Sequence, residues 1–109
     1  MKFLSRPEEL VLLTLWKMND EPYGVNIRKY LSDFTSKYWS IGSVYVPLDR
    51  LETKGFVSSY LANPTAERGG KSKRYYKITE EGQEALREIQ QITNSFWADM
   101  PNLNSNKAH

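Results

Sequence analysis

The fold is decided by one stretch, residues 40–55, which reads Ser40-Ile41-Gly42-Ser43-Val44-Tyr45-Val46-Pro47-Leu48-Asp49-Arg50-Leu51-Glu52-Thr53-Lys54-Gly55. Val44, Leu48 and Leu51 follow one another at intervals of four and three residues, so they share one face of a helix. Ser40 suits the N-cap of that helix, and Gly55 suits its C-terminal stop. We therefore expect one helix whose apolar face packs on a small core.

The opposite face of this helix is free of negative charge. Its side chains are small or basic, namely Ser43, Val46, Pro47, Arg50 and Lys54. Little bulk near the helix start, with cations farther along, suits a helix that enters the major groove of DNA. An ordinary amphipathic helix with a polar outer face fits the stretch as well. Pro47 leaves the helix start open: with Ser43 as the N-cap it lies just past the first turn, whereas with Ser40 as the N-cap it should kink the helix.

The composition argues against several kinds of site. The 109 residues contain no cysteine and a single histidine, His109, so we expect neither a thiolate metal site nor a histidine-dependent active site. The net charge is only +2, but ten of the 15 Lys and Arg fall between Arg28 and Lys77, and the segment 68–77 holds five of them with no acid. No apolar run reaches the roughly 20 residues that cross a bilayer. A cytoplasmic protein with one modest core, and without cofactor or metal, is the expectation.

Two helices are expected ahead of the central stretch. Ser5 and Glu8 form a capping-box pattern for a first helix that runs to Met18 and is apolar almost all round. A chain this short has few residues that could bury a second apolar side of this helix, so we expect that side to pack against another subunit. A second helix is expected from Val25 to Thr35. Two helices, a turn and a third helix with a polar outer face form a helix-turn-helix layout.

After Gly55 the periodicity changes from helix to strand. Residues 56–61 and 72–78 alternate like two strands, and the turn-forming residues 62–71 join them. The loop is basic and contains Gly69-Gly70, which lets it approach a phosphate closely. A basic hairpin directly after a groove-sized helix is typical of a winged helix-turn-helix. A solvated, charged loop is the simpler interpretation.

A last helix is expected from its N-cap, Thr79, to Pro101, which stops it. Its apolar stripe is longer than a core of this size can cover, and with the apolar first helix it predicts a dimer. The members of the stripe are Ala85, Leu86, Ile89, Ile92, Phe96 and Met100. We expect a DNA-binding unit at 1–78, a dimerisation helix at 79–101 and a polar tail at 102–109. The fold class is mostly α with a small β-hairpin (α+β).

Four motifs, in this order, resemble the PadR family of winged helix-turn-helix transcriptional regulators from about Glu8 to Phe96. They are the Leu-rich first helix, Pro22-Tyr23-Gly24, the run from Gly42 to Gly55, and the run from Gly69 to Gly82. The resemblance implies a homodimer that binds a pseudo-palindromic operator, usually as a repressor, with the third helix in the major groove and the wing on the DNA backbone. Unlike the family pattern, Val46 stands between Tyr45 and Pro47. The short C-terminal region is similar to the compact subgroup of the family.

The expected DNA-contacting residues come from the third helix and the wing. They are Ser40, Ser43, Tyr45, Arg50, Lys71, Lys73 and Arg74. Ser43 and Arg50 are expected to read bases, and the wing cations are expected to bind phosphate. Two simpler roles stay open: Arg50 pairs with Asp49 or Glu52, and Tyr45 lies half-buried against the second helix.

The expected dimer interface is formed by the first and last helices. It consists of Leu10, Leu13, Trp16, Leu86, Ile89, Ile92, Phe96 and Trp97. Some compact relatives bind flat aromatic drugs at the dimer centre, and this resemblance adds an aromatic effector site at Trp97, Phe96 and Trp16. Plain packing of these rings is the alternative.

No residue pattern supports an enzyme, because nucleophile sets, phosphate cradles and metal-ligand clusters are missing from the sequence. The chain is therefore predicted to be a sequence-specific DNA-binding regulator that acts through residues 40–55 and the basic wing, 62–74. The alternative is a winged-helix module that binds another protein. The basic wing tip disfavours that alternative.

Overall fold

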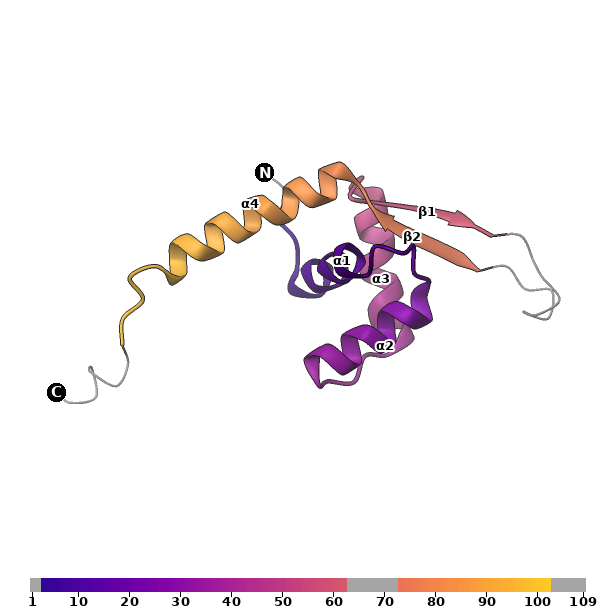
Figure 1. The fold of residues 1–109 in the computed structure, drawn as a ribbon, viewed down its shortest axis with the longest axis horizontal. Coiled ribbons are helices and arrows are strands. Elements are labelled where there is room, and N and C mark those ends of the chain that lie inside the picture. Colours follow the sequence, from indigo (N-terminus) through magenta and orange to yellow (C-terminus); the bar gives the residue numbers. More distant parts are fainter. Residues whose placement is uncertain (1–2, 63–72, 103–109) are drawn as a thin grey trace.

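The chain folds into four helices and one antiparallel hairpin (Figure 1). A computed structural model describes residues 3–62 and 73–102. The helices are α1 (Arg6–Met18), α2 (Gly24–Thr35), α3 (Ile41–Thr53) and α4 (Glu80–Trp97), and the strands are β1 (Val57–Leu61) and β2 (Arg74–Ile78). The hairpin projects from one side of the cluster of α1, α2 and α3, and α4 runs away from the other side. The predicted α+β class is confirmed.

Side-chain caps explain where three of the helices begin. Ser5 Oγ accepts the Glu8 N–H at 3.2 Å and Glu8 Oε1 accepts the Ser5 N–H at 2.7 Å, so the predicted capping box is confirmed. Ser40 Oγ accepts the Ser43 N–H at 3.1 Å, which makes Ser40 and not Ser43 the N-cap of α3. Thr79 Oγ1 accepts the Gly82 N–H at 3.0 Å at the start of α4. These boundaries follow from local sequence.

Two residues that were predicted on the outward face of α3 lie elsewhere. Pro47 is buried inside the helix, because it follows Val44 by three residues and precedes Leu51 by four and so shares their face. The helix continues as one element through Pro47, which has no N–H to donate. Lys54 turns to α1, where its Nζ donates to Glu8 Oε2 at 2.8 Å. The outward face of α3 is therefore narrower than the sequence predicted.

One apolar core joins all the elements. Val44, Leu48 and Leu51 are fully buried, as their spacing predicted. The other buried apolar residues are Val11, Leu12, Leu15, Ile27, Leu31, Phe56, Val57, Tyr76, Ile78, Ala85 and Leu86. Burial of these side chains is the main stabilising contribution to a fold of this kind.

The hairpin pairs Val57 with Ile78 at its base and Leu61 with Arg74 toward its tip. Both strands are shorter than predicted. The Tyr76 N–H donates to the Pro22 carbonyl at 2.9 Å, so the segment ahead of α2 lies along the other edge of β2 and covers it. The predicted loop with Gly69-Gly70, and Lys71, lie outside the described residues.

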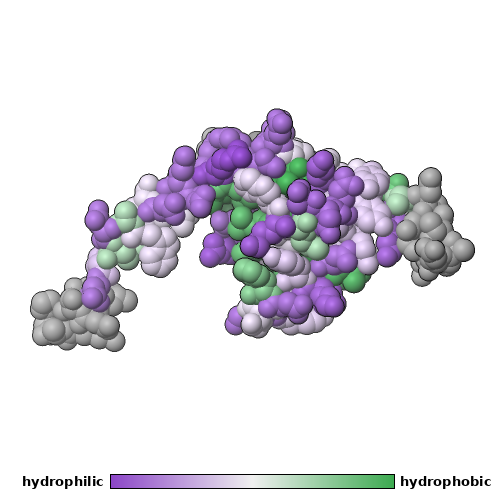
Figure 2. Space-filling view, viewed as in Figure 1, coloured by the Kyte–Doolittle hydropathy of each residue, from purple (hydrophilic) through white to green (hydrophobic). Residues whose placement is uncertain are grey.

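Helix α4 ends at Trp97, before the predicted stop at Pro101. Its first turns pack on the core through Ala85 and Leu86, and every residue from 90 onward is exposed within the described chain. Figure 2 shows apolar and weakly polar residues gathered on this far end of the helix. None of the helices in the described part of the chain combines the length and apolarity needed to cross a bilayer.

Candidate nucleic-acid interface

Arg50 lies on the outward face of α3, and its charge is not paired with any described acidic residue. Arg50 is exposed, and it forms no ion pair or side-chain hydrogen bond with the other residues that the structure describes. The alternative in which Arg50 pairs with Asp49 or Glu52 is therefore not the arrangement found. Ser43 lies about two turns earlier, and its hydroxyl donates to the Ser40 carbonyl at 2.6 Å. A guanidinium without a protein partner keeps all its donors for an external acceptor.

Glu52 is held away from Arg50 by the hairpin. The Ser59 hydroxyl donates to Glu52 Oε2 at 2.6 Å, and Arg74 Nη1 donates to Ser59 Oγ at 2.9 Å. This chain of bonds ties the last turns of α3 to both strands. It leaves Arg74 exposed at the strand end, on the side of the hairpin that faces α3. Sequence reasoning placed Arg74 but missed Ser59, because the contact joins two elements and has no local spacing signal.

Tyr45 is 36% exposed, and one side of its ring packs against the chain. Its ring lies against the backbone of Gly24, where a Cβ would collide with the tyrosine hydroxyl, and its centroid is 6.4 Å from that of Tyr76. Tyr45 therefore packs against the start of α2, as the simpler alternative expected, while part of its ring stays exposed. Burial, with the nearby Tyr45 adding to it, raises the pKa of the Tyr76 hydroxyl to about 12. The sequence placed Gly24 in a motif ahead of the second helix but did not indicate its packing role: the missing Cβ leaves room for the Tyr45 ring of α3.

Lys73 directly precedes β2 and lies against an aromatic cluster. Its Nζ lies 3.9 Å from the ring centroid of Tyr23, in cation–π geometry. Tyr75 meets Tyr23 edge-on at 5.9 Å and stacks on Tyr60 at 5.5 Å. The Tyr60 hydroxyl donates to Glu21 at 2.9 Å, and this bond raises the pKa of Tyr60. The cluster packs the tip-ward part of the hairpin, which carries Lys73 and Arg74, against the segment ahead of α2.

The α1–α4 face carries the residues that were predicted for a dimer interface, with one correction. Leu86 is only 4% exposed, because it belongs to the apolar core of the chain. Leu13, Ile92, Phe96 and Trp97 are exposed. Leu10, Trp16 and Ile89 are partly covered.

An open cavity of about 520 Å³ lies between α1 and α4. Trp16 lines it, and the Arg87 guanidinium lies 5.3 Å from the Trp16 ring centroid. Phe96 and Trp97, which were predicted beside Trp16, lie farther along α4 and do not line this cavity within one chain. Arg87 was missed because only the fold brings it to Trp16.

The geometry agrees with comparisons to known proteins. A family model described as the transcriptional regulator PadR-like family matches residues 12–88. The chain belongs to the PadR-like family. A PadR family regulator from Eggerthella lenta DSM 2243 is 28% identical with a TM-score of 0.68, over 82% of this chain and 75% of that one. A PadR family regulator from Clostridium difficile R20291 is 28% identical with a TM-score of 0.61, over 85% of this chain and 99% of that one. No curated protein matches the sequence.

A PadR-like regulator from Bacillus cereus strain ATCC 14579 is 25% identical with a TM-score of 0.65, and the similarity covers 84% of each chain. PadR-like proteins are DNA-binding transcriptional regulators, and the arrangement of α3 and the hairpin is that of the helix and wing in a winged helix-turn-helix. The PadR-like match includes both elements, and it ends before the exposed half of α4.

Proposed function

We propose that this PadR-like regulator is a cytoplasmic, homodimeric repressor that binds a pseudo-palindromic operator. In this proposal residues 1–78 form the DNA-binding unit and 79–101 the dimerisation helix. Ser43 and Arg50 contribute to base recognition from the major groove, while Lys73 and Arg74 contact phosphate. Ser40 and Tyr45 complete the proposed DNA-contacting set on α3, and Lys71, which lies outside the described residues, completes it on the wing side.

One observation carries the proposal: Arg50 has no partner among the described residues although acids lie next to it in the sequence. Glu52 accepts a hydrogen bond from the Ser59 hydroxyl, and Lys54 forms an ion pair with Glu8. The basic group that remains on the outward face of α3, in the last turn of the helix, is therefore Arg50. An arginine placed in this way on a groove-sized helix matches the commonest base contact, a bidentate bond to guanine.

The dimer rests on the apolar surface that one chain leaves uncovered. Leu13 of α1, together with Ile92, Phe96 and Trp97 of α4, is exposed, and a two-fold axis would cover each of these side chains in both subunits. The cavity beside Trp16 would then lie next to the dimer face. An aromatic effector seated there would act by favouring one angle between the subunits, which requires unequal affinity for the two states.

The test is Arg50→Ala against a panel of operator variants. Loss of the guanidinium should weaken operator binding by about 1–3 kcal/mol and relax the preference at one base position. Arg6→Ala is the matched control, because it removes the same charge from an exposed side chain of α1. Equal losses on every sequence would reduce Arg50 to a phosphate contact. Unchanged DNA binding would instead favour a winged helix that binds protein.

A further inference from the structure

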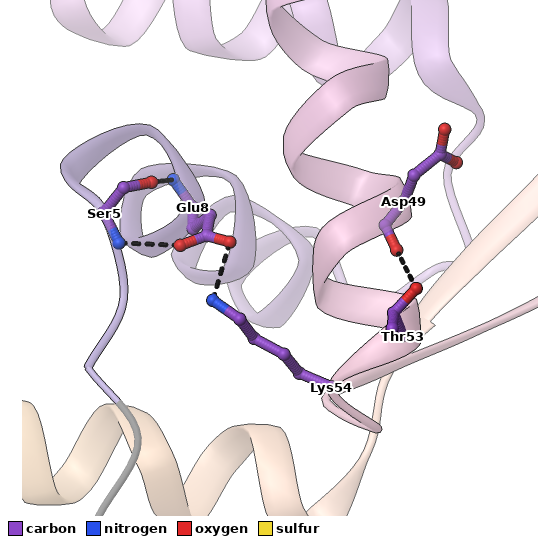
Figure 3. Close-up of polar contacts among 5 residues, drawn as sticks. All are labelled: Ser5, Glu8, Asp49, Thr53 and Lys54. Atoms are coloured by element: carbon purple, nitrogen blue, oxygen red, sulfur yellow. Dashed lines mark hydrogen bonds and ion pairs between the residues drawn. The ribbon is translucent and has the colours of Figure 1, made fainter.

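A buried carboxylate joins the first turn of α1 to the end of the DNA-reading helix. Glu8 is 3% exposed, and its two oxygens accept from different segments. Oε1 accepts the Ser5 N–H at 2.7 Å, and Oε2 accepts the Lys54 ammonium at 2.8 Å. Figure 3 shows the two side chains reaching toward each other from α1 and from the residue that follows α3.

The electrostatics keep this contact charged. Burial by itself would raise the pKa of Glu8, but the bonds from Lys54 and Ser5 outweigh it, and the net pKa is lowered. A charged hydrogen bond of this kind is shorter and stronger than a neutral one. Glu8 and Lys54 are therefore committed to each other, and neither belongs to the DNA-contacting set.

The contact differs in kind from the rest of the α1–α3 boundary. Elsewhere the two helices meet through apolar side chains such as Leu12 and Leu48, whose attraction has little directional preference. Across the described residues, Glu8–Lys54 is the one hydrogen bond or ion pair between α1 and α3 with its C-cap. Lys54 also donates its own N–H to the Arg50 carbonyl at 3.0 Å, so the contact is one helical turn from the proposed base reader.

The same turn of α1 belongs to the other face of the subunit. Glu9, the residue after Glu8, lines the cavity between α1 and α4, together with Leu13 and Trp16 farther along α1. A shift of α1 caused by the dimer partner or by a bound molecule would thus move the anchor of α3. We propose that Glu8 is a positioning residue, which through Lys54 sets the orientation of the DNA-reading helix relative to the α1–α4 face. This inference rests on the proposed function.

The test uses Glu8→Gln in the full-length protein. Glutamine keeps the volume and can keep the capping bond to the Ser5 N–H, because capping boxes use Glu or Gln, but it removes the charge from the contact with Lys54. The ratio of operator affinity to non-specific affinity should fall roughly 2- to 30-fold, which is the range for mutations along a coupling contact. The dimer dissociation constant and the salt slope of non-specific binding should stay unchanged.

Lys54→Met should lower the same ratio, and the double variant should add little, because both remove one interaction. Binding is compared at a temperature where circular dichroism shows each variant folded, and Lys54→Gln replaces any variant that unfolds. Glu84→Gln is the control, since Glu84 forms an exposed ion pair on α4 at 3.4 Å. A reduced melting temperature with an unchanged affinity ratio would overturn the positioning role alone. A wild-type protein without sequence preference would overturn both the proposed function and this inference.

Discussion

Phe96→Ala should separate the dimer into monomers. Phe96 is 74% exposed on α4 in the single chain, and Trp97 beside it is 68% exposed. In the proposed dimer this end of α4 packs against the partner subunit. Removing the ring takes away an apolar contact and leaves the core of the subunit unchanged, because Phe96 is not a core residue.

The magnitude follows from the exposed area. A fully covered aromatic side chain buries roughly 150–250 Å², so covering about half of the exposed Phe96 ring removes about 75 Å² from water. At about 25 cal/mol per Å² this contributes about 2 kcal/mol per subunit. A two-fold interface repeats the contact, which doubles the loss to about 4 kcal/mol per dimer. The dimer dissociation constant should then rise by about three powers of ten.

Sedimentation velocity over a concentration series measures this constant directly. Phe34→Ala is the matched control, because Phe34 is 69% exposed but belongs to α2, which is neither of the two helices of the proposed interface. The control should dimerise as the wild type does. Equal weakening by both substitutions, or no weakening by Phe96→Ala, would refute the assignment of α4 to the interface.

Four further substitutions test the stability of the fold and the role of the wing. The pKa of Tyr76 is about 12 in the folded protein and 10.0 in the unfolded chain, so the free energy of unfolding falls as the pH rises above 10. Tyr76→Phe should reduce this loss of stability. Urea midpoints from neutral to alkaline pH measure it, and parallel curves for the wild type and the variant would contradict the prediction. Gly82→Ala should lower the free energy of unfolding by about 1–3 kcal/mol, because a Cβ would collide with the Phe56 carbonyl oxygen. Gly42→Ala, which faces open space, should instead raise it by about 0.5–1 kcal/mol in the same unfolding assay, and the opposite order would be inconsistent with this packing. Lys73→Ala should weaken binding to all DNA sequences alike and lower the salt slope by about 1, and a loss confined to one operator would argue for base contact.

The local part of the fold was predictable from the sequence. The Ser5–Glu8 capping box needs only two residues three positions apart, and the buried face of α3 needs only the spacing of Val44, Leu48 and Leu51. Pro47 shows where such reasoning went wrong. Pro47 was predicted on the outward face of the helix, although its spacing from Val44 and Leu51 puts it on the buried face, where the structure has it.

The rest of the site depends on contacts between distant segments. Lys54 reaches Glu8 across 46 residues, and nothing in the sequence around either residue indicates the other. The pairing of Glu52 with Ser59 likewise needs the hairpin to fold back on α3. Because these contacts decide which charged groups stay free, the sequence could propose Arg50, Lys54 and Arg74 together but could not choose among them.

The central claim is that a dimer of this chain reads a two-fold symmetric operator through α3. Footprinting on the DNA upstream of its own gene, with the salt concentration varied, tests it most directly. The account predicts a protected site with two half-sites about one duplex turn apart, roughly 34 Å, and steep salt dependence. Weak protection that is indifferent to sequence, both there and in a genome-wide pull-down, would contradict it.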